Sequence, residues 1–317
     1  MKTEKVDLQK VLKKLVSIYL GILLFFLALL LLLNLPLFIS VIFDFTNGKE
    51  VVNVASGRVI GNISNPDEKA LAIMAWERDY FQNPYSIYDQ NSTLNKYNIY
   101  KINGDYKLFV RGAPVSWMIY SRLANCEEYA KVFVLMMNEA GVKSNLIQAT
   151  GADHVWAEYM YDGYSIAVDP SQNIVIGNHK GEFEKNMNVK FPYIEAVDLD
   201  GIKMDVSDEY IKRGNLTILV FDNNQPVYEA QVIIKSPYLM KNRGGRYNKP
   251  SDVISNLTDY NGKTFFKLGS QEYIVEVGVK KLYLFNTIYQ KNVTVEINKE
   301  NLLNFNIDID EKNINLY

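Results

Sequence analysis

The sequence predicts an α+β protein, and three patterns along the chain carry that prediction. An amphipathic helix with clear ends is expected over 126–140, and a β-hairpin over 154–161 and 164–169 follows it. After residue 212, short segments with strand composition recur between turn residues, as in a β-sandwich. Helices and antiparallel strands in separate segments define the α+β class.

An apolar segment over 15–43 precedes these elements and exceeds the roughly 20 residues that a helix needs to cross a bilayer. Five lysines lie before it, whereas the first positive charge after it is Lys49. The positive-inside rule therefore places the N-terminus in the cytoplasm and the chain after about residue 45 outside. A cleaved signal peptide is the alternative, but the segment is longer than a signal's apolar core and lacks a small-residue cleavage site. We expect a single-pass membrane protein.

Composition and pattern divide the chain into five parts. These are a cytoplasmic basic tail at 1–14, a transmembrane helix at 15–43, a tether at 44–65, an α+β domain at 66–211 and a β-sandwich at 212–317. Within the α+β domain, a helix is expected over 66–81, a polar loop over 83–106 and a short helix over 114–123.

The composition argues against several classes of function. The net charge is −2 and the pI is near 5.9, which indicates no nucleic-acid surface. The chain has two histidines, one cysteine and no clustered carboxylates, so a metal centre has little support. Glycine-rich phosphate-binding motifs are absent as well. We therefore expect neither a metal nor a cofactor.

The single cysteine, Cys126, cannot form an internal disulfide. Asn125 is a favourable N-cap, and Glu128 completes a variant of the capping box, so Cys126 is the first residue of the predicted helix. The positive end of the helix dipole favours a thiolate there. Glu127 and Glu128 oppose that effect, so the thiol needs a histidine partner to be activated.

A two-residue Asp-Gly turn joins the predicted strands 154–161 and 164–169, and such a turn fixes the register of a hairpin. With the strand ends opposite each other, His154 and Asp169 become diagonal neighbours on one face. A slip of one residue would separate them. The approach of Cys126 does not follow from this pattern, because it requires the helix end to pack over that same face.

The segment 66–176 resembles the transglutaminase-like superfamily, whose members share a papain-like cysteine–histidine–aspartate arrangement. The resemblance rests on Asn-Cys-Glu-Glu-Tyr-Ala around Cys126, His-Val-Trp-Ala-Glu from His154, and Val-Asp-Pro around Asp169. The three motifs follow the family's order along the chain. One departure is Ala124, where a glycine is common. The region after residue 212 looks like the transthyretin-like or carboxypeptidase-regulatory β-sandwiches.

The resemblance implies catalytic roles for three residues: Cys126 as the nucleophile, His154 as the base and Asp169 as the residue that orients the base. It also implies that the backbone amide of Cys126 contributes to an oxyanion hole. A second oxyanion donor is left open among three residues, namely Gln82, Gln90 and Trp117.

We therefore expect a membrane-anchored, extracytoplasmic thiol enzyme that acts on peptide or carboxamide bonds through a thioester. Hydrolysis by a protease or amidase is favoured over crosslinking, because water needs no binding site and an acceptor amine does. Its partner would be a protein or peptide substrate, with the cell envelope as one source. The alternatives are a non-catalytic surface protein that binds peptide or glycan on this fold, and a structural element of the cell envelope.

Overall fold

The computed structural model describes residues 8–88, 93–178, 180–242, 248–281 and 285–307. Helices and strands each take up 36% of the chain, and nearly all strand pairs are antiparallel, which confirms the predicted α+β class. The chain divides into two compact units, which are described separately below. The first unit comprises residues up to 58 and 80–124, and the second comprises 59–79 and 125–317.

The first unit begins with the apolar segment, which forms two helices. They are α1 (Leu8–Leu33) and α2 (Leu35–Val59), with a break at Asn34 just before Pro36. Proline has no amide hydrogen to donate to a preceding turn, so the ladder is interrupted there. Within the described residues, Lys13–Leu33 is long and apolar enough to span a bilayer, which is compatible with a single-pass anchor. A signal sequence near an N-terminus has the same properties.

The segment expected as a tether over 44–65 is helical for most of its length, because α2 continues to Val59. Gly48, Val52 and Ala55 are buried on one face of α2 at helical spacing. A second helix, α4 (Val115–Ser121), contacts it, and Ser116 Oγ donates to Asp44 Oδ1 at 2.6 Å. Most of the expected tether is therefore a helix that contacts α4 through Asp44 and Gly48.

The segment expected as a polar loop over 83–106 contains a short hairpin. Its strands are β1 (Ile99–Ile102) and β2 (Asp105–Leu108), preceded by the 3-10 turn η1 (Asn95–Tyr97). Asn103 and Gly104 form the turn, both with positive φ, at 51° and 94°. Asn-Gly is the preferred pair for such a turn, so the sequence did carry this signal.

The second unit is built around a six-stranded antiparallel sheet in the order β6-β5-β4-β3-β7-β8. Its strands are β3 (Ser144–Thr150), β4 (His154–Tyr161), β5 (Tyr164–Asp169), β6 (Ile174–Gly177), β7 (Tyr193–Val197) and β8 (Lys203–Asp205). Its helical elements are α3 (Pro66–Tyr80), α5 (Cys126–Glu139), η2 (Lys180–Glu182), α6 (Phe183–Met187) and α7 (Ser207–Tyr210).

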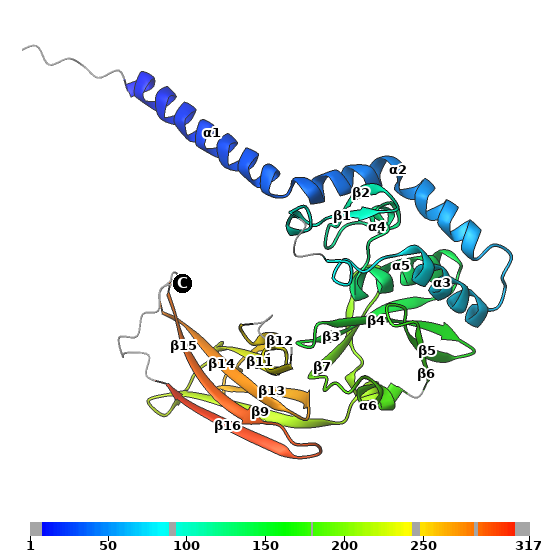
Figure 1. The fold of residues 1–317 in the computed structure, drawn as a ribbon. Helices are drawn as coiled ribbons and strands as arrows, with labels where there is room; N and C mark the ends of the chain where they lie inside the picture. Colours follow the sequence, from blue (N-terminus) through cyan, green and yellow to red (C-terminus); the bar gives the residue numbers. More distant parts are fainter. Residues whose placement is uncertain (1–7, 89–92, 179, 243–247, 282–284, 308–317) are drawn as a thin grey trace, which may run out of the picture. The chain divides into compact units, whose positions relative to one another are not determined.

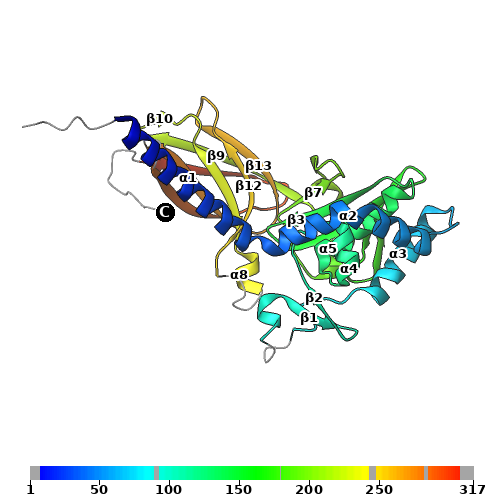
Figure 2. The ribbon, with the colours of Figure 1, turned by 90° about the horizontal axis from the view of Figure 1, so that it is seen from above.

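The two faces of this sheet bury different clusters. Helix α5 lies along one face, where the rings of Phe133 and Tyr159 are 6.2 Å apart (Figure 1). The other face carries an aromatic cluster centred on Trp156, which is fully buried against Phe183 and Phe191. Figure 2 shows α3, α4 and α5 from above.

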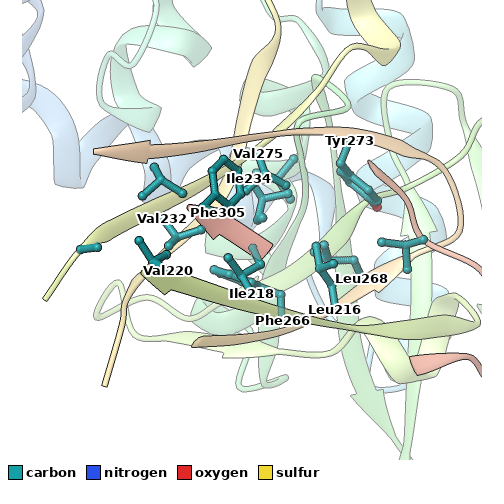
Figure 3. Packing of buried hydrophobic residues seen from close by; sticks show 14 of the residues in the cluster. Leu216, Ile218, Val220, Val232, Ile234, Phe266, Leu268, Tyr273, Val275 and Phe305 are labelled. Carbon is teal, nitrogen blue, oxygen red and sulfur yellow. The ribbon is translucent and has the colours of Figure 1, made fainter. Parts of the chain in front are cut away.

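The remaining strands form two four-stranded sheets that share one hydrophobic core (Figure 3). The strands are β9 (Arg213–Asp222), β10 (Gln225–Pro226), β11 (Gln231–Ser236), β12 (Ser251–Leu257), β13 (Lys263–Gly269), β14 (Glu272–Lys281), β15 (Phe285–Thr294) and β16 (Glu300–Ile307), with the short helix α8 (Tyr238–Asn242) after β11. Alternate residues Leu216, Ile218 and Val220 of β9 point into the core, as the period-two pattern requires. Strand β16 pairs with β9 in parallel, whereas the other pairs are antiparallel.

Candidate active site

Cys126 is the first residue of α5, as the capping pattern predicts. The side chain of Asn125 accepts hydrogen bonds from the amides of Glu127, at 3.0 Å, and Glu128, at 3.5 Å. Glu128 Oε2 in turn accepts from the Asn125 amide at 3.1 Å, which completes the capping box. The cap therefore uses the second and third amides of the helix and holds the sulfur at its positive end.

The two glutamates beside Cys126 oppose a thiolate less than their charges suggest. Glu127 pairs with Lys131 at 2.5 Å, one turn along the helix. Burial raises the pKa of Glu128, which favours its neutral form. The negative charge near the thiol is thus partly neutralised by an ion pair and partly reduced by burial.

His154 and Asp169 meet across neighbouring strands in the predicted register. Tyr161 lies opposite Tyr164, and the pairing continues down the hairpin. His154 Nε2 is 2.8 Å from Asp169 Oδ2. Asp169 is fully buried, and its Oδ1 accepts from the Ser171 hydroxyl at 2.7 Å. The carboxylate is therefore held from both sides.

The thiol of Cys126 hydrogen-bonds to the His154 ring. Because Nε2 is engaged by Asp169, Nδ1 is the ring nitrogen that faces the sulfur. Burial lowers the pKa of His154, but the hydrogen bonds and charges of Asp169 and Cys126 outweigh it and raise that pKa from 6.5 to about 9. The ring is therefore protonated at neutral pH, between the Asp169 carboxylate and the Cys126 sulfur.

The structure shows how Cys126 reaches His154, which the sequence left open. The body of α5 packs on the sheet face that carries Tyr159, not on the face that carries Trp156. Contact occurs because Cys126 begins its helix and His154 begins its strand, so both side chains lie at the ends of their elements. The sequence pattern placed His154 on one face of the sheet. It did not show that His154 lies at the end of its strand, where the first residue of a helix can reach it.

Two aromatic rings pack against the imidazole of His154. The ring of Trp156 stacks on His154, with centroids 5.7 Å apart and planes 27° apart, and Phe183 adds a second ring at 6.4 Å. Trp156 also contacts Tyr210, a residue that no sequence motif singled out. Tyr210 lies about fifty positions away in a short helix, and only the fold brings it to the site.

Two of the three candidates for a second oxyanion donor, Trp117 and Gln82, lie among the described residues of the first unit. The indole of Trp117 donates to the Leu108 carbonyl at 3.2 Å, so that donor is already engaged. Gln82 lies in the first unit, where its backbone bonds to that of Arg122 and Ala124. Gln90 lies outside the described residues. Among the described residues, no group of three or more metal-ligating side chains gathers.

Residues 55–170 match the family described as the transglutaminase-like superfamily, so the chain contains a transglutaminase-like domain. A curated relative, a peptide-N(4)-(N-acetyl-β-glucosaminyl)asparagine amidase of Kluyveromyces lactis, is 29% identical over 137 residues. The match covers 43% of this chain and 38% of the relative, so the chain spans well under half of that protein.

Two groups of solved structures show distant similarity. Rad4–Rad23 bound to a 6-4 photoproduct lesion has a TM-score of 0.34 at 14% identity, covering 57% of this chain and 47% of that one. A putative protease from Parabacteroides distasonis has a TM-score of 0.32 at 11% identity, covering 80% of this chain and 50% of that one. Similarity at this level carries no argument about function.

Proposed function

We propose that the chain is a membrane-anchored, extracytoplasmic thiol hydrolase that cleaves carboxamide or peptide bonds through Cys126, His154 and Asp169. The observation that carries the proposal is the hydrogen-bonded series from Asp169 to His154 to Cys126. A helix-start thiol, an imidazole and a buried carboxylate are the attacker, the base and the orienter of an activated nucleophile.

The first half-reaction forms a thioester. The sulfur of Cys126, as thiolate, attacks the carbonyl carbon of the substrate amide, and the carbonyl oxygen becomes an oxyanion. The Cys126 amide, at the positive end of α5, is placed to donate to that oxyanion. The protonated Nδ1 of His154 then gives its proton to the leaving nitrogen, the C–N bond breaks, and an amine departs.

The second half-reaction releases the acyl group. Nδ1 of His154, now neutral, takes a proton from water, and the hydroxide attacks the thioester carbonyl. The C–S bond breaks and a carboxylic acid leaves. The Cys126 thiolate and the protonated His154 ring, which keeps the proton taken from water, are thereby restored. Asp169 keeps its hydrogen bond to Nε2 throughout and stabilises the charged ring.

Hydrolysis is favoured over transfer to an amine by two considerations. An acceptor amine requires a second binding site, whereas water does not. The relative in Kluyveromyces lactis is named as an amidase, which is a hydrolytic activity on a carboxamide. The substrate class that fits both is a protein or peptide carboxamide, including an asparagine side chain. The apolar helix over Lys13–Leu33 and the lysines before it support the extracytoplasmic part of the proposal through the positive-inside rule.

The full chain in detergent micelles is the correct material for testing this proposal. A fragment that begins at residue 46 would lose the contacts of Asp44 and Phe43 with α4.

In the experiment, the protein is incubated with fluorogenic peptide amides, glutamine amides and an N-glycosylated asparagine peptide. Release of free acid, abolished in Cys126→Ala, supports hydrolysis. An acyl adduct on Cys126 that hydroxylamine removes as an acyl hydroxamate, with release of the free thiol, establishes the thioester. If added primary amines replace water in the product, the protein is a transferase. If no substrate gives turnover or adduct, the enzyme proposal fails and a binding module remains.

A further inference from the structure

A chain of buried polar groups leads away from the His154 ring and takes no part in the proposed acyl transfer. It starts at Trp156, whose indole stacks on the imidazole. The indole Nε1 donates to the Tyr210 hydroxyl at 3.1 Å. The Tyr210 hydroxyl donates to Glu158 Oε1. Trp156 and Tyr210 are 0% and 1% exposed, so water does not compete for these bonds.

The far end of this chain is a buried ion pair. Lys180 Nζ lies 2.6 Å from Glu158 Oε1 and 2.6 Å from Glu209 Oε2. The Ser165 hydroxyl donates to Glu158 Oε2 at 2.6 Å. Because the desolvation cost of a buried ion pair largely offsets its attraction, such a pair is weak evidence for a role in stability. The better explanation for the Lys180–Glu158 pair is that it fixes the geometry of the groups hydrogen-bonded to it.

The hydrogen bonds of this series all donate in the direction away from the His154 ring. Trp156 donates to Tyr210, and Tyr210 donates to the Glu158 carboxylate, so each bond strengthens the next. Burial, and then the charge of Glu158, raises the pKa of Tyr210 well above 10, so its hydroxyl stays a neutral donor. Electron density moves toward the indole, whose face lies against the charged His154 ring and stabilises it.

We infer that Tyr210 is a positioning residue for His154, acting through Trp156 and tied in place by Glu158 and Lys180. The inference rests on the proposed function and adds to it a residue outside the three-residue set. Without the hydroxyl, the indole loses the bond that fixes its plane. The imidazole of His154 then stacks on a less ordered indole, and its Nδ1 points less consistently at Cys126.

The test uses the full chain and the substitution Tyr210→Phe, which keeps the packed ring and removes only the hydroxyl. Two readouts need no substrate: the rate at which iodoacetamide alkylates Cys126, and the titration of the His154 imidazole by NMR. The chain has two histidines, so the spectrum is simple to assign. The charged groups that face the ring, Asp169 and Cys126, are unchanged by the substitution.

The matched control is Tyr273→Phe, another fully buried tyrosine, whose hydroxyl donates to the Gly269 carbonyl at 2.8 Å. We expect Tyr210→Phe to slow alkylation at neutral pH by about tenfold, the effect of losing about 1.4 kcal/mol of interaction, and to lower the pKa of His154. Tyr273→Phe should leave both readouts unchanged even where it lowers thermal stability equally, because a merely structural hydroxyl does not act on the thiol.

The outcomes separate this inference from the proposed function. Alkylation in Tyr210→Phe equal to wild type, with both far faster than His154→Ala, overturns the positioning role alone. Wild-type alkylation no faster than His154→Ala overturns both. If Tyr210→Phe does not fold, Glu158→Gln is measured instead, because the loss of charge weakens both the hydrogen bond that residue 158 accepts from Tyr210 and its attraction to Lys180. A slower rate supports the inference, and an unchanged rate overturns it.

Discussion

His154 Nε2 and Asp169 Oδ2 lie 2.8 Å apart across the β4–β5 pair, with the carboxylate fully buried. The second oxygen of Asp169 accepts from the Ser171 hydroxyl and from the Gln172 amide. The carboxylate therefore cannot turn away from the ring without losing these bonds. This relationship fixes which ring nitrogen faces Cys126, and it gives the site a defined response to pH.

The first prediction concerns the pH dependence of stability. The pKa of His154 is about 9 in the folded chain against 6.5 for the free side chain. Because the folded value is higher, protonation stabilises the fold. The contribution is full below about pH 6.5 and lost as the pH rises through 9, and it amounts to roughly 3 kcal/mol. Urea unfolding at about pH 6 and about pH 9.5 should show this loss in wild type.

Asp169→Asn should weaken that dependence, because the amide keeps the hydrogen bond but removes the charge. Asp252→Asn, at an exposed carboxylate, is the control and should behave as wild type. Equal pH dependence in wild type and Asp169→Asn would contradict the role given to this pair.

The second prediction concerns the start of α5. Asn125→Ala removes the acceptor for the amides of Glu127 and Glu128 and should lower the free energy of unfolding by about 1 kcal/mol. Asn125→Asp keeps an acceptor oxygen there and should preserve most of the stability. Chemical denaturation of the three proteins checks this. An Asn125→Ala variant as stable as wild type would show that the cap does not hold the helix end.

The third prediction concerns the two-sheet region. A Cβ at Gly214 would lie 2.0 Å from the Glu296 carbonyl oxygen, whereas at Gly278 the nearest atom is 3.9 Å away. Gly214→Ala should therefore destabilise the fold by about 1–3 kcal/mol, and Gly278→Ala should be tolerated. Thermal unfolding distinguishes the two. Similar melting temperatures for both variants would refute the close approach of β9 to the 295–297 segment.

The fourth prediction concerns Glu77, a fully buried carboxyl in α3. Both of its oxygens lack a hydrogen-bond partner among the described residues, and burial raises its pKa well above 4.5. A raised pKa in an acid favours folding at low pH and opposes it as the pH rises. Glu77→Met should therefore stabilise the fold at neutral pH by about 1–3 kcal/mol. A destabilised variant at about pH 8 would reveal a partner for the charged form.

Local features of the fold could be predicted from the sequence, whereas much of the packing between elements could not. The Asn125 cap and the Asp-Gly turn each depend on neighbouring residues, so the start of α5 and the register of β4 and β5 could be predicted. The packing of α2 on α4 could not, because residues as small as Gly48 and Ala55 carry little hydrophobic signal even at helical spacing.

The candidate site shows the same division. His154 and Asp169 follow from strand alternation and a turn, which are local rules. The side of the sheet that α5 covers is decided by the fit of whole faces, so the sequence left it open. Tyr210 and Lys180 belong to elements with no motif. Tyr210 reaches Trp156, and Lys180 reaches Tyr210, only because the chain returns to the same sheet face.

The most direct test of the proposed site is the alkylation of Cys126 by iodoacetamide across pH, in wild type and in His154→Ala. The proposal predicts that wild type reacts at about pH 6 at least about tenfold faster than the variant, because the imidazolium stabilises the thiolate. The two proteins should converge at high pH, where the thiol ionises without help. Identical profiles across the whole range would contradict an activated thiol and leave Cys126 an ordinary cysteine on a transglutaminase-like fold.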